Sequence, residues 1–291
     1  MPKFVDWRPT LAINHTMKKY SDEIFPLSLQ LQTVEDDLPF MHNDVRAYYF
    51  GMLKSLLLGY YHSFLSLEIS HGVANSVSLQ KALSMSPNQL HRIRQLFSSP
   101  LSVTGQISNF NRNLLISGWS AFELLITILC ENILPDDIQQ ELLSFEYEEM
   151  KKRLKLEEDD SARRRYTKKH LAHVPMPRKY GKLFDAIKRP YSRDLKEDRQ
   201  FLIFLGDCRN TVHSNFIYFG QDQKTYNFHG VNFEFITNRV LRYNHPDQHS
   251  LKLQLDLLKE LWEISFELCL VLGVDKEIPY PDLDGQTDIW A

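Results

Sequence analysis

The spacing of apolar residues predicts that most of this chain is helical. Apolar side chains recur at intervals of three and four residues, which places them on one face of a helix. This pattern covers four long stretches, at residues 10–38, 44–72, 109–134 and 248–272. A shorter helix is expected to begin at Ser86-Pro87, because serine caps a helix and proline suits its first turn.

The stretch 109–134 is apolar on nearly all sides, which is typical of a buried central helix. Pro135 ends this stretch, and Asp136-Asp137 begins a further helix that we expect to reach about residue 158. Another helix is expected to begin at Ser192-Arg193-Asp194 and to carry a short apolar run. Together these helices would supply the core of the protein.

The periodicity changes beyond residue 213, where apolar residues begin to alternate as they do in strands. Aromatic and β-branched residues gather in three runs, at 216–219, 225–228 and 231–235. Gly220 and His229-Gly230 separate the runs, and glycine permits the tight turns that join strands. The sequence therefore predicts a β-hairpin or a three-stranded meander at about 215–236.

Composition and charge narrow the classes of protein to which the chain can belong. It has 291 residues, of which 43% are hydrophobic and 24% charged, and its formal net charge is -3. Such a chain can bury a sizeable core in one large domain or two small ones, and it has no general electrostatic attraction for nucleic acid. The three cysteines lie in apolar helical runs, which indicates buried thiols in a reducing compartment.

The sequence offers no sign of a metal, a cofactor or a membrane segment. No Cys/His cluster has the spacing of a zinc site. Residues Met1–Trp7 lack the apolar segment of a signal peptide, and no run approaches the roughly 18 uncharged apolar residues of a membrane helix. We therefore expect a cytoplasmic protein that works without a metal or cofactor and does not cross a membrane.

Arg209 and His213 are the strongest candidates for chemistry. Their separation of four residues places both side chains on one face of a helix. An arginine can hold a phosphate through two hydrogen bonds, and a histidine can transfer a proton near neutral pH. The alternative is a structural role, since cations late in a helix also interact with its last carbonyl groups.

The residues around this pair resemble the HEPN superfamily, which is named for its occurrence in higher eukaryotes and prokaryotes and for nucleotide binding. The resemblance rests on Arg209-Asn210-Thr211-Val212-His213-Ser214-Asn215, followed by Phe219 and Phe228-His229-Gly230, and on Gly118–Leu125, which looks like the first core helix of that superfamily. It covers roughly residues 109–273. Three residues separate Arg209 from His213, whereas the superfamily usually has four to six, but the shorter spacing keeps both on one helix face.

The resemblance implies a mainly α fold, in which a HEPN-like antiparallel helical bundle carries a small β-hairpin and follows an N-terminal helical region. Residues 1–108 would form the N-terminal region, and residues 109–274 the HEPN-like domain. That domain would contain a charged insertion at about 158–192 as well as the hairpin. Residues 275–291 would form an irregular acidic tail.

The resemblance also implies a function, because active HEPN proteins are metal-independent endoribonucleases that act as homodimers. His213 would act as the general base that takes the proton of the ribose 2′-hydroxyl, or as the general acid that protonates the leaving 5′-oxygen. Arg209 would hold the scissile phosphate, and Asn210 would orient the phosphate or His213. DNA lacks that hydroxyl and would not be cut. The resemblance further implies that the protein is a toxin or defence effector, with an antitoxin or another protein as its partner.

Two further interpretations of the resemblance stay open. The chain is either such an enzyme, or a non-catalytic HEPN-like module that binds a nucleotide, RNA or protein, or a purely structural helical dimer. Glu123 bears on this choice, because a carboxylate in an apolar helix needs a partner. Arg209 is the natural partner, either in a structural ion pair or in support of catalysis. Cys208 adjoins Arg209 and is expected to be a buried structural thiol.

A basic patch lies within the charged insertion. Its cations would hold RNA phosphates and its tyrosine would stack on a base. The patch comprises Arg163, Arg164, Arg165, Tyr166, Lys168 and Lys169. The alternative is a solvated helix face whose charge is neutralised by the acidic residues 157–160.

Overall fold

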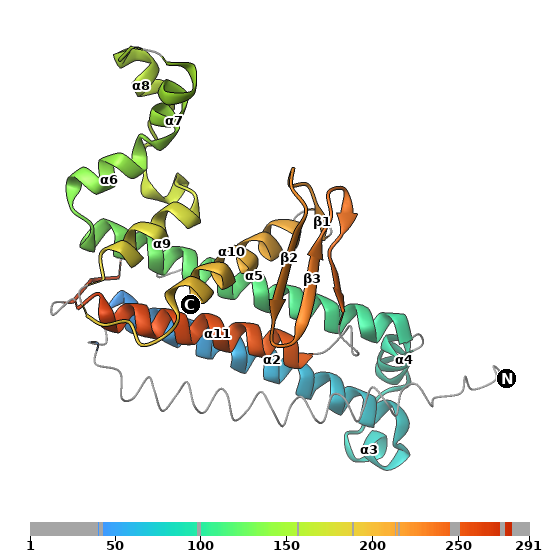
Figure 1. Cartoon of the computed structure of the whole chain (residues 1–291). Coiled ribbons are helices and arrows are strands. Elements are labelled where there is room, and N and C mark those ends of the chain that lie inside the picture. Colours follow the sequence, from blue (N-terminus) through green and yellow to red (C-terminus); the bar gives the residue numbers. More distant parts are fainter. Residues whose placement is uncertain are drawn as a thin grey trace. The chain divides into compact units, whose positions relative to one another are not determined.

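The computed structural model describes residues 40, 43–97, 100–155, 157–187, 189–212, 214, 216–244, 251–273 and 277–280. Within these ranges the protein is mainly helical and carries two small antiparallel sheets (Figure 1). The predicted helix at 10–38, residues 248–250 and most of the predicted tail lie outside the described residues.

The helices occupy most of the stretches that the apolar spacing predicts. They are α2 (Val45–Asn75), α3 (Val77–Ala82), α4 (Pro87–Leu96), α5 (Pro100–Ile133), α6 (Asp136–Leu143), α7 (Phe145–Leu154), α8 (Asp160–Tyr166), the short 3-10 helix η1 (Leu171–His173), α9 (Met176–Asp185), α10 (Leu195–Val212) and α11 (Leu251–Val271). The prediction of a mainly α protein is therefore confirmed for the described part of the chain.

Two predicted helix starts are confirmed by their caps. The Ser86 hydroxyl accepts a hydrogen bond from the Gln89 N–H at 3.3 Å, and the Gln89 side chain accepts one from the Ser86 N–H at 2.9 Å. This reciprocal pair closes the first turn of α4. At the start of α10, the Asp194 carboxylate accepts from the backbone N–H groups of Lys196 and Glu197 at 2.9 and 3.0 Å.

Three other helix boundaries were wrong. The helix predicted to stop at Gly72 continues to Asn75, because glycine ends a helix only where its φ becomes positive, and Gly72 keeps a negative φ. The central helix predicted to begin at residue 109 begins at Pro100. The helix predicted to reach about residue 158 is divided at Ser144, whose backbone leaves the helical region at φ -96° and ψ 6°.

The strands form two separate sheets after α10. β1 (Ile217–Tyr218) pairs with β4 (Arg239–Val240), while β2 (Lys224–Phe228), β3 (Val231–Phe235) and β5 (Arg242–Asn244) form a three-stranded sheet in the order β2-β3-β5.

The predicted hairpin is the β2–β3 pair, and its turn has the expected chemistry. His229 and Gly230 have φ values of 51° and 74°, and a type I′ turn requires a positive φ at both positions. The predicted first strand, at 216–219, does not join this hairpin. Its residues 217–218 pair with β4 instead, and the third strand of the sheet is β5.

The chain divides into two compact units, each assembled from separate stretches of sequence. The first consists of Met1–Asp37, Met52–Gly118 and Ile217–Lys259, and the second of Leu38–Gly51, Trp119–Phe216 and Glu260–Ala291. The sheets thus belong to the first unit and α10 to the second. The boundary expected between residues 108 and 109 falls inside α5, which is one continuous helix.

The core of the second unit contains the apolar faces of α5, α9 and α10. Phe122, Leu183 and Leu202 are completely buried there, one from each helix. Residues Arg112–Ile133 of α5 have the length and apolar composition of a membrane span, but more than half of that segment is buried inside the protein. Such burial is typical of a central core helix, which is what the sequence predicts for this stretch.

Candidate functional site

The predicted contact between Arg209 and Glu123 is present in the second unit. Arg209 lies in the last turn of α10, and its Nη2 atom is 3.6 Å from the Oε2 atom of Glu123 on α5. Both side chains are about one-third exposed, at 30% and 31%. The pair therefore lies at the edge of the core, where solvent or a ligand reaches it.

Glu123 belongs to a line of polar residues along α5. Trp119, Glu123 and Thr127 are four residues apart and so lie on one face of the helix. The Trp119 Nε1–H donates to Glu123 Oε1 at 2.9 Å, and the Thr127 hydroxyl donates to the Glu123 carbonyl at 2.6 Å. Trp119 thus orients the Glu123 carboxylate, while Thr127 contacts only the backbone of Glu123.

The Arg209 guanidinium has few hydrogen-bond partners. Its Nη1 atom donates to the Asn210 side-chain oxygen at 3.3 Å, and the 3.6 Å approach to Glu123 is too long for a hydrogen bond. The Nε atom is buried and has no partner among the described residues. A guanidinium with unused N–H donors at a partly exposed position can bind an oxyanion through two parallel hydrogen bonds.

The end of α10 is closed by a local turn. The Thr211 hydroxyl donates to the Cys208 carbonyl at 2.7 Å, and the Thr211 carbonyl accepts from the N–H groups of Ser214 and Phe216 at 3.0 and 2.7 Å. Asn210 is exposed on the last turn. His213 lies outside the described residues, so its alignment with Arg209 stays a prediction.

Cys208 is a buried thiol, as expected. It is 4% exposed, and burial raises its pKa well above the ordinary value, with a further contribution from the Asp207 carboxylate. Cys130 and Cys269 are also buried and free. A buried thiol with a raised pKa is a poor nucleophile, which removes Cys208 from the candidate chemistry.

Lys179 is a charged residue near this site that the sequence pattern did not single out. It is only 2% exposed, and its Nζ atom donates to the Thr127 hydroxyl at 2.7 Å. Burial lowers the pKa of its ammonium group, while the charges of Cys130, Glu123 and Glu131 act in the opposite direction. One signal for its burial is present in the sequence, because Lys179 is three residues after Met176 and four before Leu183, both of which are buried.

The predicted basic patch lies on α8 and the turn that follows it, and is partly neutralised. Arg163 approaches Glu158 at 3.5 Å and Lys168 approaches Glu146 at 2.8 Å. Asp159 instead caps α8, accepting from the N–H groups of Ser161 and Ala162. The other three cations are Arg164, Arg165 and Lys169. They are exposed and have no acidic partner among the described residues. The expected neutralisation is thus present for part of the patch, and RNA binding by the other cations stays a prediction.

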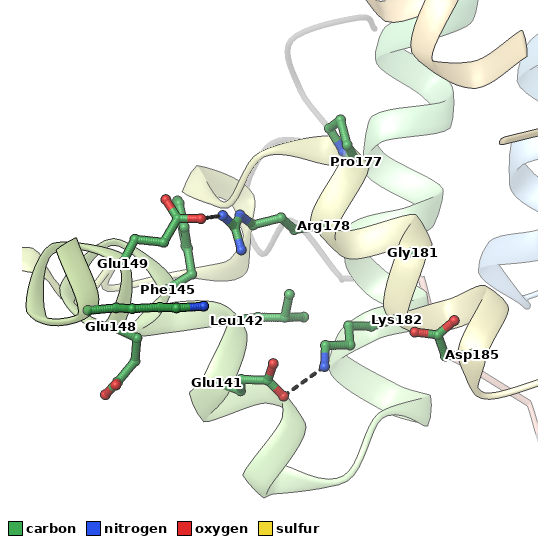
Figure 2. A pocket seen from close by; sticks show the side chains of 11 residues that line it. Glu141, Leu142, Phe145, Glu148, Glu149, Pro177, Arg178, Gly181, Lys182 and Asp185 are labelled. Carbon is green, nitrogen blue, oxygen red and sulfur yellow. Dashed lines mark hydrogen bonds and ion pairs between the residues drawn. The ribbon is translucent and has the colours of Figure 1, made fainter. Parts of the chain in front are cut away.

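A cavity of about 370 Å³ lies between the α6–α7 segment and α9 (Figure 2). Two of its cations form ion pairs with neighbouring carboxylates. Lys182 donates to Glu141 at 2.7 Å, and Arg178 pairs with Glu149. Arg178 also stacks over the Phe145 ring. None of the residues predicted for chemistry lines it. This cavity is therefore separate from the Arg209 site.

Within the described ranges, no three His, Cys, Asp or Glu side chains are placed so that they could share a metal ion. No protein-family model matches the chain, and no curated protein or solved structure is significantly similar to it. The case for a function therefore depends on the Arg209 site and on the chemistry of its residues.

Proposed function

We propose that this protein is a HEPN-like, metal-independent endoribonuclease that cleaves RNA through its own 2′-hydroxyl groups. The observation that carries the proposal is the state of the Arg209 guanidinium. The Glu123 charge holds it at the end of α10, and its only hydrogen bond to a described residue is the 3.3 Å contact with Asn210. Among the described residues, Asn210 alone accepts a hydrogen bond from the two Nη groups, and their other N–H donors are available for a phosphate.

The proposed reaction needs one anion site and one proton carrier. Arg209 binds the scissile phosphate and stabilises the charge that develops on it. His213, four residues further along the sequence, accepts the proton of the 2′-hydroxyl as its oxygen attacks phosphorus. The bond from phosphorus to the 5′-oxygen breaks, and a proton returns to that oxygen. The products are a 2′,3′-cyclic phosphate and a 5′-hydroxyl.

A homodimer completes this proposal, because separate groups must remove one proton and deliver another. Two copies of His213 in a composite cleft meet that requirement, one from each protomer. Asn210, which is exposed beside Arg209, orients the phosphate or the histidine. In this scheme the enzyme acts in the cytoplasm as a toxin or defence effector, under the control of an antitoxin or another protein partner.

The exposed cations of α8 and the following turn provide RNA affinity away from the reacting phosphate. Arg164, Arg165 and Lys169 have no acidic partner among the described residues, and the Tyr166 ring is 36% exposed beside them. Cations that bind phosphates release counterions from RNA, so affinity falls as salt rises. Replacing these three cations with alanine should weaken RNA binding and flatten its salt dependence, whereas cleavage of saturating RNA should persist.

The test is RNA cleavage in EDTA by the full chain, with the product ends identified by mass. His213→Ala should lower kcat by roughly 10²- to 10⁴-fold. Arg209→Lys keeps the charge but loses the bidentate fork, so it should also be strongly impaired. Arg199→Lys is the matched control on the same helix, because Arg199 pairs with Asp185 instead. A 2′-deoxy nucleotide at the cleaved position should block the reaction.

Inactivity of the wild type over a broad panel of RNAs, or full activity of His213→Ala, would contradict this function. A second candidate is RNA binding without cleavage, which the three exposed cations favour. It predicts that RNA binds with strong salt dependence, that no product forms, and that His213→Ala changes nothing.

A further inference from the structure

The two oxygens of the Glu123 carboxylate contact two different residues, Trp119 and Arg209. Oε1 accepts the indole N–H of Trp119 at 2.9 Å, and Oε2 faces Arg209 Nη2 at 3.6 Å. Trp119 is 3% exposed and packs against Phe122 with ring centroids 5.5 Å apart. A rigid, buried donor therefore fixes the orientation of a carboxylate that is itself about one-third exposed.

The absence of a side chain at Gly206 on α10 leaves room for the indole ring of Trp119. A Cβ atom at Gly206 would lie 3.3 and 3.4 Å from the Cζ2 and Cη2 atoms of the Trp119 ring. The ring thus lies directly against the backbone of α10, one turn before Arg209. The same tryptophan that orients Glu123 also sets how closely α5 approaches the helix that carries Arg209.

We infer that Trp119 is a positioning residue for Arg209, acting through Glu123 and seated against Gly206. This inference rests on the proposed function as far as catalysis is concerned. Each step is a direct contact. The absence of a side chain at Gly206 leaves room for the Trp119 ring. The ring N–H orients the Glu123 carboxylate, and this carboxylate faces the Arg209 guanidinium. None of these three residues needs to contact the RNA phosphate.

Loss of this route has a specific consequence for the reaction. Without the Trp119 N–H, the Glu123 carboxylate is free to rotate, and the guanidinium then lacks a fixed counter-charge. A misplaced arginine stabilises the transition state less well while RNA binding through other cations is unchanged. Trp119→Phe should therefore lower kcat by roughly tenfold and leave KM nearly unchanged.

The chain contains a matched control for this substitution. Trp262 is another tryptophan of the second unit, and its Nε1 atom is buried with no hydrogen-bond partner among the described residues. Trp262→Phe makes the same chemical change in the core without removing a hydrogen bond to any residue that the structure describes. It should leave kcat unchanged at temperatures well below unfolding.

The first measurement compares kcat for Trp119→Phe, Glu123→Gln and the double variant. Because both residues act on Arg209 by one route, the double variant should be no slower than the slower single one. Gly206→Ala should lower kcat in the same direction, since it displaces the ring. Multiplying effects in the double variant, or unchanged kcat in Trp119→Phe, would overturn the inference while the nuclease itself stands.

The second measurement does not depend on activity. The guanidinium Nε–H resonance of Arg209, assigned by its loss in Arg209→Lys, should shift and exchange faster with solvent in Trp119→Phe than in the wild type or Trp262→Phe. An unchanged resonance in Trp119→Phe overturns the positioning role. A changed resonance together with a wild type that cleaves no RNA would instead overturn the proposed function and leave the positioning role in place.

Discussion

Asp44 and Arg46 form an ion pair that is almost completely withdrawn from solvent at the start of α2. Arg46 donates Nε to Asp44 Oδ1 at 2.7 Å and Nη2 to Oδ2 at 2.6 Å, and Asp44 and Arg46 are 0% and 3% exposed. Burial alone would raise the pKa of Asp44, but hydrogen bonds from Arg46 and from the Ile278 N–H hold it below its ordinary value. The pair thus joins the beginning of α2 to residues near the C-terminus.

Removal of one partner from this pair should be costly. Asp44→Ala removes a carboxylate that accepts two side-chain hydrogen bonds from the buried Arg46 guanidinium, and we expect the free energy of unfolding to fall by about 3 to 5 kcal/mol. The loss is measured by urea unfolding at pH 7. Since the folded pKa of Asp44 is lowered, its contribution is present at neutral pH and is lost as the pH falls through that folded pKa. A loss below about 1 kcal/mol, as for surface pairs, would contradict this expectation.

Arg193 should also be important for stability, because it contacts three carboxylates. It donates to both oxygens of the buried Asp198 carboxylate, at 2.9 and 3.0 Å, and also contacts Glu260 and Glu263 of α11. Arg193→Met leaves a buried carboxylate beside two other acids, so unfolding free energy should fall by about 3 to 5 kcal/mol.

The control for Arg193 is Lys182→Met, because Lys182 pairs with Glu141 at the surface. That substitution should change stability by less than about 1 kcal/mol. Equal losses for Lys182→Met and Arg193→Met in the same chemical unfolding experiment would show that burial does not decide the strength of these pairs.

Two glycine-to-alanine substitutions in the first unit should have opposite effects. Gly230 has a φ of 74° in the β2–β3 turn, where alanine is strained, so Gly230→Ala should destabilise by about 1 to 2 kcal/mol. Gly59 lies inside α2, and a Cβ atom added there would meet nothing within 4 Å, so Gly59→Ala should stabilise by up to about 1 kcal/mol. Thermal unfolding of both variants measures the signs, and the same sign for both would contradict the backbone argument.

The buried Lys179 predicts a particular dependence of stability on pH. Its folded pKa is lowered, chiefly by burial, from the ordinary value of 10.5. Between the two pKa values the unfolded chain binds more protons than the folded one, so this lysine makes stability rise with pH. The stability of the wild type minus that of Lys179→Met should therefore increase from neutral pH toward pH 10.5. Urea unfolding across that range tests it, and a constant or falling difference would be the opposite result.

Local patterns in the sequence predicted the elements well where a helix or turn has its own chemical signature. The cap at Ser86 and the turn at His229-Gly230 were confirmed, because each depends only on neighbours in the sequence. The predicted stop at Gly72 was wrong, since glycine permits a helix end without requiring one. Of the two alternatives for the strands, the hairpin is present and the meander of the three predicted runs is not, because residues 217–218 pair with β4 and strand pairing depends on distant contacts.

The candidate site was predicted in part. Charge in an apolar helix led to the pairing of Glu123 with Arg209, since a carboxylate there needs a counter-charge wherever the helices pack. Trp119 and Lys179 were missed, because a tryptophan and a lysine at such positions have ordinary roles in most helices. The structure shows that Trp119 donates to Glu123 within α5, and that the packing of α9 against α5 lets Lys179 donate to Thr127.

The sequence by itself determined the local elements of this protein: its apolar spacing dictates helices, and its glycines and capping residues dictate turns and ends. The tertiary structure alone decided which side chains share a site. In the sequence, nothing distinguishes Gly206 from other glycines or Arg209 from other cations late in a helix. The structure distinguishes them, because the Trp119 ring lies against Gly206 and Glu123 faces Arg209. The reason is physical, since periodicity follows from bonds within a segment, whereas burial and charge pairing follow from contacts between segments.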